Sequence, residues 1–214
     1  MLLAVSVAAL TTACRSADAG NAPDIVQPGP PGESSRVISA GRATDLSRIR
    51  HTPADVRFMQ GMIGHHAQAL EMTALAPART AREEVRLLAR RIEASQRDEI
   101  QAMQEWLGAR GEKLPDPHAH HAPGAPLMPG MLTGAQMRRL GAAAGTEFDR
   151  LFLELMIAHH EGALVMVDQL FASPGAGQEP DVFAFASDVD ADQRAEIDRM
   201  RAVLATIDVK EPQR

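Results

Sequence analysis

The segment Phe58–Met72 (FMQGMIGHHAQALEM) recurs 94 residues later as Phe152–Met166 (FLELMIAHHEGALVM), and eight of the fifteen positions are identical. A second pair of segments, Leu88–Leu107 and Phe185–Leu204, follows at an offset of 97 and shares the pattern Gln-Arg-x-Glu-Ile-x-x-Met. The chain therefore contains an internal duplication of two consecutive segments. Each copy has the length and apolar spacing of a helical hairpin.

Helix signals accompany the repeated segments. Thr52-Pro53 offers an N-cap and a proline at the first helical position, Thr80-Ala81-Arg82-Glu83 reads as a capping box, and Thr133-Gly134-Ala135-Gln136 starts a short helix. No stretch after residue 50 shows the sustained alternation typical of strands. We therefore predict an all-α fold, an antiparallel four-helix bundle of ferritin-like type. Its two helical hairpins are joined by a long crossover, residues 109–146, that contains a short helix.

The N-terminal region predicts export. Residues 1–13 (MLLAVSVAALTTA) are uncharged and mostly apolar, but are too few to span a bilayer, which takes about 20 helical residues. They are typical of a signal peptide. Cys14 follows as in a bacterial lipoprotein, which predicts a lipid anchor on that residue and a protein facing the periplasm or the cell exterior. Ordinary secretion of an unanchored protein is the alternative. Residues 14–50 read as a flexible tether, and residues 51–210 as the helical domain.

Composition excludes several classes of protein. The formal net charge of −6 and the 3% aromatic content argue against a nucleic-acid partner. A single cysteine excludes an internal disulfide, a cysteine-based zinc finger and a cysteine-ligated iron–sulfur cluster. Histidine and methionine are abundant instead, with 8 and 11 residues.

The histidines and methionines of the repeats share helix faces. At 100° per residue, the first repeated segment places its histidine pair and flanking methionines within an arc of roughly 140°, and the second repeats this face. Methionine stripes are usually core packing. Burying an adjacent histidine pair in both hairpins is costly without partners, and a metal ion would supply one. Because thioethers and imidazoles suit copper, we expect copper, with Cu(I) favoured over Cu(II).

The crossover holds a second cluster, in which His118, His120 and His121 are followed by Met128 and Met131. Short histidine-rich tracts bind transition metals, which predicts a secondary, weaker site that captures metal and feeds the bundle. A solvated loop with incidental histidines is the alternative.

Patterns of catalytic metal sites are missing from the sequence. Neither histidine pair is preceded by the Glu-x-x-His of di-iron bundles, and Leu164 interrupts a His-Glu-x-x-His motif at His160. We therefore expect a binding protein rather than an enzyme. Two alternatives stay open. One is a ferroxidase-like oxidase using Glu71, Glu154 or Glu161, and the other is a purely structural or interaction bundle.

The doubled Met-Ile-x-His-His motif, the partner motifs ending in Met103 and Met200, and the Met-Pro-Gly-Met run at 128–131 resemble the DUF305 family over about residues 52–208. These are exported bacterial proteins with a ferritin-like bundle. The resemblance implies copper binding in copper resistance or homeostasis. We expect the protein to sequester the copper or to hand it on to a partner that the sequence does not identify. Carried over by motif position, the implied ligands are Met62, His65, His66, Met72, Met156, His159, His160 and Met166, with contributions from Met103 and Met200.

Overall fold

The computed structural model describes residues 24–27, 34–43, 45, 49–122 and 124–210 and divides into two units, Met1–Arg48 and Ile49–Arg214. The first unit contains an antiparallel pair of strands, β1 (Ile25–Gln27) and β2 (Arg36–Ile38), and a short helix α1 (Ala40–Ala43). These elements fall within the predicted tether. The predicted signal peptide and Cys14 lie outside the described residues.

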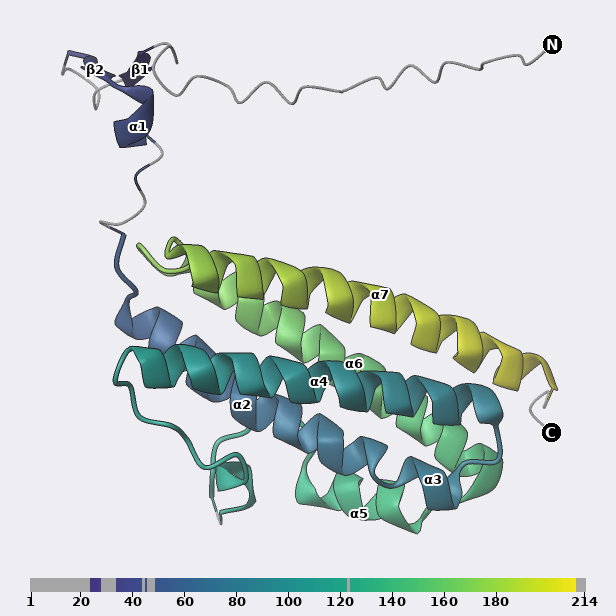
Figure 1. Ribbon diagram of the computed structural model, residues 1–214. Helices are drawn as coiled ribbons and strands as arrows, with labels where there is room; N and C mark the ends of the chain where they lie inside the picture. Colours follow the sequence, from purple (N-terminus) through teal and green to yellow (C-terminus); the bar gives the residue numbers. More distant parts are fainter. Residues whose placement is uncertain (1–23, 28–33, 44, 46–48, 123, 211–214) are drawn as a thin grey trace, which may run out of the picture. The chain divides into compact units, whose positions relative to one another are not determined.

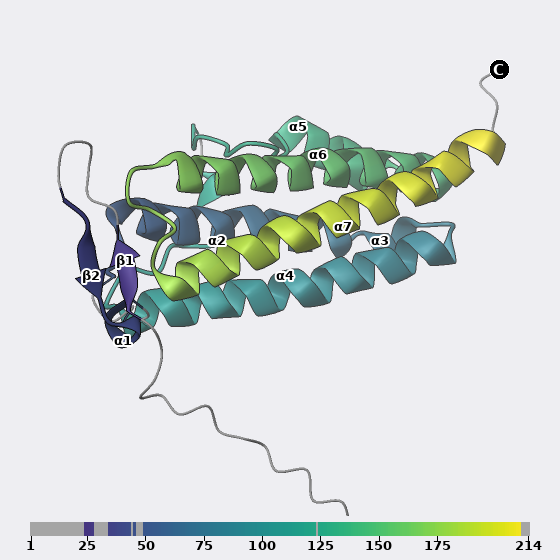
Figure 2. The same ribbon diagram turned by 90° about the horizontal axis from the view of Figure 1, so that it is seen from above.

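Four long helices make up the second unit, α2 (Pro53–Thr73), α4 (Glu83–Ala109), α6 (Gly145–Ala172) and α7 (Pro180–Lys210). Figure 1 shows α2 with α4 and α6 with α7 as antiparallel hairpins. The hairpins pack mainly through α2 and α6, with α4 and α7 also in contact (Figure 2). The predicted all-α fold is confirmed. None of the described helices combines the length and apolar character needed to cross a membrane.

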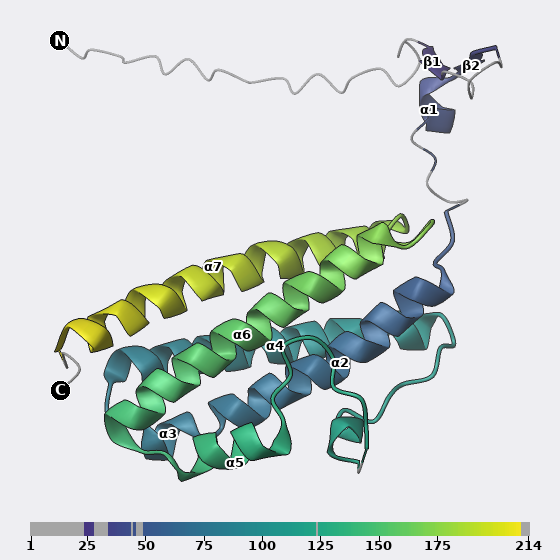
Figure 3. The same ribbon diagram turned by 180° about the vertical axis from the view of Figure 1, so that it is seen from behind.

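Short elements connect the long helices. Helix α3 (Ala76–Arg79) links α2 to α4, and the crossover from α4 to α6 contains the 3-10 turn η1 (Ala119–His121) and helix α5 (Gly134–Ala142). This crossover returns along the bundle beside α2 (Figure 3). As a result, α6 starts at the same end of the bundle as α4, which is the arrangement that a single long crossover between two hairpins produces.

Local capping agrees with the sequence at two of the three predicted helix starts. Thr52 and Thr133 each accept a hydrogen bond from the backbone N–H three residues later, and the side chains of Asp55 and Gln136 bond back to the cap residue. The box predicted at Thr80 is wrong, because α4 begins at Glu83 and the Thr80 hydroxyl donates to Asp149 of α6 instead. A buried contact between hairpins replaces the local cap.

A polar layer divides the buried core into two apolar clusters. One cluster includes Met72, Ile92, Phe152, Met156 and Met200, and the other includes Phe58, Met62, Met103, Val167 and Met166. Each long helix contributes to both clusters and carries buried polar residues between them. These are the histidine pairs of α2 and α6 and the glutamines Gln96 of α4 and Gln193 of α7. The repeated motifs thus meet at mid-bundle.

The crossover packs its backbone directly on α6 beside this layer. A Cβ at Gly162 would lie 2.1 Å from the Pro129 carbonyl oxygen, and Gly130, with φ of 76°, has no room for one either. The Gln68 side chain of α2 fixes the same run by donating to the Leu132 carbonyl (3.0 Å) and accepting from its N–H (2.6 Å). The crossover is therefore held to both histidine-bearing helices.

Gly162→Ala should destabilise the domain, because the added methyl group collides with backbone rather than with a movable side chain. We expect a loss of about 1–3 kcal/mol in the free energy of unfolding measured with urea. Gly141→Ala is the matched control, since a Cβ there meets nothing within 4 Å. It should leave the stability unchanged or raise it by up to about 1 kcal/mol. Equal stabilities for the two variants would contradict this close packing.

Candidate metal centre

The two histidine pairs meet between α2 and α6. His65, His66, His159 and His160 are all 0% exposed. The rings of His65 and His159 lie 3.8 Å apart between centroids, and the two rings within each pair are 6.2 Å apart. The first histidine of each repeat thus faces its counterpart across the helix interface, while the second points toward the partner helix.

Three of these imidazoles are held through Nε2. His66 donates to Glu99 of α4 (2.5 Å), His160 donates to Glu196 of α7 (2.7 Å), and His65 donates to the carbonyl of Pro129 (3.0 Å). The acceptors are carbonyl or carboxylate oxygens, so Nε2 carries the proton and Nδ1 of a neutral ring keeps a lone pair. Such outer contacts orient imidazoles toward metals in known sites.

The remaining ring nitrogens are unsatisfied. Among the described residues, Nδ1 of His65, His66 and His160 has no hydrogen-bond partner, and neither has Nδ1 or Nε2 of His159. The side-chain amide of the nearby Gln96 is equally unpartnered. Because buried polar atoms are nearly always hydrogen-bonded, this set of unpaired nitrogens at one level of the bundle is suited to hold a cation.

The electrostatics keep the facing pair neutral. Burial, reinforced by the neighbouring imidazole of His66, lowers the pKa of His65 from 6.5 to about 3. Burial and the proximity of His65 lower the pKa of His159 well below 6.5. Burial raises the pKa of Glu99, but the hydrogen bond and charge interaction with His66, with smaller contributions from Ser95 and His160, together outweigh it and the net shift is downward. A neutral facing pair suits a metal cation, since a metal needs an unprotonated nitrogen.

The centre has an approximate two-fold symmetry that follows from the duplication. His65 corresponds to His159, His66 to His160, and Glu99 to Glu196. The crossover breaks this symmetry, because the Pro129 carbonyl serves His65 while His159 has no such acceptor in the described structure. The glutamates were missed as functional residues in the sequence, although the shared Gln-Arg-x-Glu-Ile motif contains both.

The structure distributes the predicted methionine ligands over both apolar clusters. Met62 and Met156 are buried one helical turn before the histidine pairs, on opposite sides of the polar layer. Met72 and Met166 lie seven residues beyond the first histidine of each pair, about 10 Å along the helix axis. Met62 and Met156 are thus within one helical turn of the histidine pairs, while Met72, Met103, Met166 and Met200 belong to the two apolar clusters.

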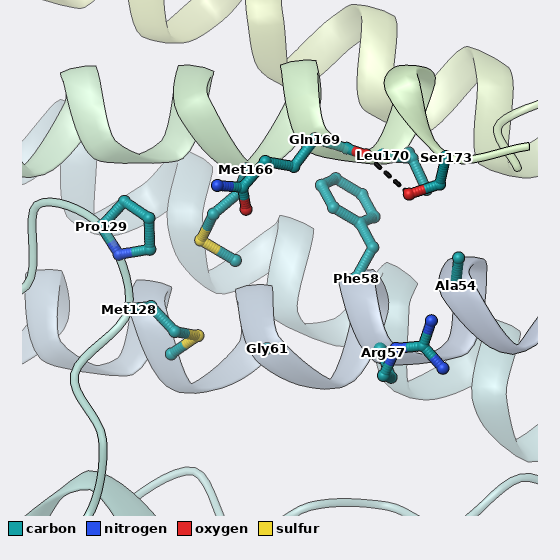
Figure 4. A pocket seen from close by; sticks show the side chains of 10 residues that line it. All are labelled: Ala54, Arg57, Phe58, Gly61, Met128, Pro129, Met166, Gln169, Leu170 and Ser173. Carbon is teal, nitrogen blue, oxygen red and sulfur yellow. Dashed lines mark hydrogen bonds between the residues drawn. The ribbon is translucent and has the colours of Figure 1, made fainter.

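Met166 also borders a surface hollow of about 260 Å³. Figure 4 shows its sulfur and that of Met128, from the crossover, facing this hollow between α2 and α6. A Cβ built on Gly61 would lie 3.1 Å from the Met128 sulfur. Met128, predicted to belong with the histidine tract, thus lies with Met166, and Met131 is buried with 7% of its surface exposed.

The histidine tract itself gathers around one carboxylate. His118 and His121 bond to Glu71 of α2, and His120 lies 3.5 Å from the same oxygen. The sequence offered Glu71 only as a candidate oxidase carboxylate, because its approach to the tract depends on the path of the crossover. The other two candidates, Glu154 and Glu161, are exposed, and Glu161 pairs with Arg201.

Comparison with known proteins agrees with this arrangement. The sequence model of the family described as "Domain of unknown function (DUF305)" matches residues 55–204. The chain belongs to the DUF305 family. A search of curated proteins finds no match.

Solved DUF305 structures resemble the chain over its helical unit. A DUF305 fragment from Deinococcus radiodurans is 34% identical, with a TM-score of 0.61, over 73% of this chain and 98% of that one. A Streptomyces coelicolor DUF305 protein, described as a "putative secreted protein", is 32% identical with a TM-score of 0.61. The match covers 72% of this chain and 93% of that one. CopM in the Cu(I)-bound form is 26% identical with a TM-score of 0.54, over 71% and 96%. Similar matches exist to CopM with Cu(II) and with silver bound.

The depressed pKa values predict that acid destabilises the metal-free protein. Below pH 6.5 the unfolded chain protonates His65 and His159, whereas the folded chain keeps His65 neutral until about pH 3 and also resists protonation of His159. The free energy of unfolding should therefore fall between pH 6.5 and 4.5, with His65 alone contributing a slope that approaches about 1.4 kcal/mol per pH unit and His159 adding to it.

Urea unfolding at a series of pH values measures this slope. His65→Leu/His159→Leu should flatten it, while His51→Asn, at a half-exposed histidine outside the centre, should not. A wild-type stability that is constant from pH 6.5 to 4.5 would show that the facing imidazoles are not buried neutral groups.

Proposed function

We propose that this chain is an exported copper-binding protein that sequesters Cu(I), or hands it on, through the histidine layer of its bundle. The observation that carries the proposal is the facing pair His65 and His159, whose rings lie 3.8 Å apart while His159 has no hydrogen-bond partner among the described residues. These two imidazoles are the inner ligands, and His66 and His160 support them from the same layer.

Cu(I) fits this donor set better than a harder ion. Imidazole nitrogen and thioether sulfur are ligands that copper prefers, and a monovalent soft ion accepts few ligands. Met62 and Met156 bring sulfur within one helical turn of the layer. Silver, also monovalent and soft, is bound along with copper in the CopM structures to which the chain is similar. Cu(II) is the second oxidation state to test on this chain, since CopM also has a Cu(II)-bound form.

We propose that the protein is exported and binds copper outside the cytoplasm. Residues 1–13 have the pattern of a signal peptide and Cys14 that of a lipidated cysteine. The similarity to a DUF305 protein described in terms of secretion supports export. Outside the cytoplasm thiolates oxidise readily, so histidine and methionine are suitable ligands for copper there. The role that we propose is copper resistance or homeostasis. The sequence does not identify a protein that would receive the copper.

Anaerobic competition with a Cu(I) chelator tests the core site. All samples carry Cys14→Ser, because a free thiol would itself bind Cu(I). His65→Asn/His159→Asn should weaken Cu(I) binding by more than about 100-fold, because even an outer partner of a metal ligand is typically worth 10–100-fold. His51→Asn, whose ring contacts Trp106 and Glu112 instead, is the control and should bind like the parent. Equal affinities for both variants, or no competition by the parent at micromolar chelator, would contradict the proposal.

A metal-dependent oxidase is the second candidate, and the observation favouring it is that Glu99 and Glu196 contact the histidine layer. We propose binding without turnover, because both carboxylates accept imidazole N–H bonds and thereby orient ligands. Oxygen uptake with Fe(II) or Cu(I), measured on the same samples, distinguishes the two. Uptake that exceeds the protein-free rate and is lost in the double variant would favour the oxidase.

A further inference from the structure

A second cluster of nitrogen and oxygen donors lies on the outside of α2. Glu71 accepts from His118 Nδ1 at 3.0 Å and from His121 Nε2 at 2.7 Å, and His120 Nε2 is 3.5 Å from the same carboxylate oxygen. One ligand atom each of Glu71, His120 and His121 lies within 4.8 Å of the other two, and in the described part of the chain no other set of three or more His, Cys, Asp and Glu side chains does so.

His120 is the member whose geometry indicates a ligand. Its side chain is only 5% exposed, and its Nδ1 donates to the Pro117 carbonyl at 3.1 Å. That bond places the proton of a neutral ring on Nδ1 and leaves a lone pair on Nε2. The buried Nε2 has no hydrogen-bond partner in the described structure and faces a carboxylate oxygen. A metal ion placed between these two atoms would be bound by both of them.

We propose that Glu71, His120 and His121, with His118 at the rim, form a binding site for a divalent borderline metal ion, Cu(II) foremost. The site contains imidazole and carboxylate donors without sulfur, so it lacks the soft ligand that favours Cu(I). Among divalent ions of the first transition row, nitrogen and oxygen donors bind Cu(II) most tightly. His120 has the carbonyl-bonded second nitrogen that is usual for metal-ligating histidines.

The site also explains how the crossover is held on α2. Exposure of His118 (62%) and His121 (58%) leaves the tract open to solvent, while Glu71 is 23% exposed on the helix. Met128 and the Pro117 carbonyl both approach Gly64, so the ends of this part of the crossover rest on the same helix. A bound ion would tie the tract to Glu71. Without the metal, the tract would be connected to Glu71 only by hydrogen bonds from its imidazoles.

Cu(II) titration of the full-length chain, followed by electron paramagnetic resonance, tests this site. The parent should bind one Cu(II) here with a spectrum showing coupling to two or three imidazole nitrogens. Glu71→Gln should weaken this binding at least about 10-fold, and His120→Asn should remove one nitrogen from the spectrum. Glu112→Gln is the matched control, because Glu112 contacts a lone histidine, His51, at 3.3 Å. It should change neither the affinity nor the spectrum.

The same titration in a His65→Asn/His159→Asn background separates this site from the histidine layer. The effect of Glu71→Gln should persist there whether or not the layer binds Cu(I). Unchanged Cu(II) affinity and spectrum in Glu71→Gln, or a parent spectrum without imidazole nitrogen, would overturn the proposal. Because Glu71 and Glu112 are partly exposed and His120 lies in the crossover, circular dichroism should show the parent fold in the three single variants Glu71→Gln, His120→Asn and Glu112→Gln.

Discussion

The interior of this bundle depends on the burial of imidazoles whose lone pairs find no hydrogen-bond donor. A protein core can bury a histidine cheaply when both ring nitrogens are paired, and here one nitrogen of His66, His160 and His65 is paired and the other is not. His159 lacks both partners within the described structure. An apolar layer of the same volume would be at least as stable, so the arrangement is best explained by what it binds. In the metal-free state this burial costs free energy, and the low pKa values of His65 and His159 reflect that cost.

Much of this architecture could be predicted from the sequence, because it follows from local periodicity and from the duplication. The spacing in Met-Ile-x-His-His places sulfur and imidazole on one helix face, and the repeat at offset 94 requires two such faces. The all-α fold, the caps at Thr52 and Thr133 and the convergence of the two pairs are confirmed by the structure. The methionines of the implied ligand set extend beyond the layer, because a spacing of seven residues carries Met72 and Met166 about 10 Å along the helix axis.

What the sequence could not provide depends on contacts between distant segments. The carboxylates that hold His66 and His160 lie on other helices, and the Pro129 carbonyl comes from a crossover without regular periodicity. Thr80 shows the same limit, since its hydroxyl bonds Asp149 of α6 rather than capping α4. Glu71 illustrates it again. A carboxylate on α2 and a histidine tract about fifty residues later meet only because the crossover folds back along that helix.

The crossover therefore does more than connect the two helical hairpins. It supplies the hydrogen-bond acceptor of His65, lies against Gly162 beside His159, and carries the Met128 sulfur to the hollow lined by Met166 (Figure 4). Anomalous X-ray scattering at the copper edge, from crystals grown anaerobically with Cu(I), tests the central claim most directly. The account predicts a copper peak within bonding distance of a free ring nitrogen of His65 and one of His159, inside the bundle. Fully occupied copper found only elsewhere, with those two rings in contact and no density beside their unpaired nitrogens, would contradict it.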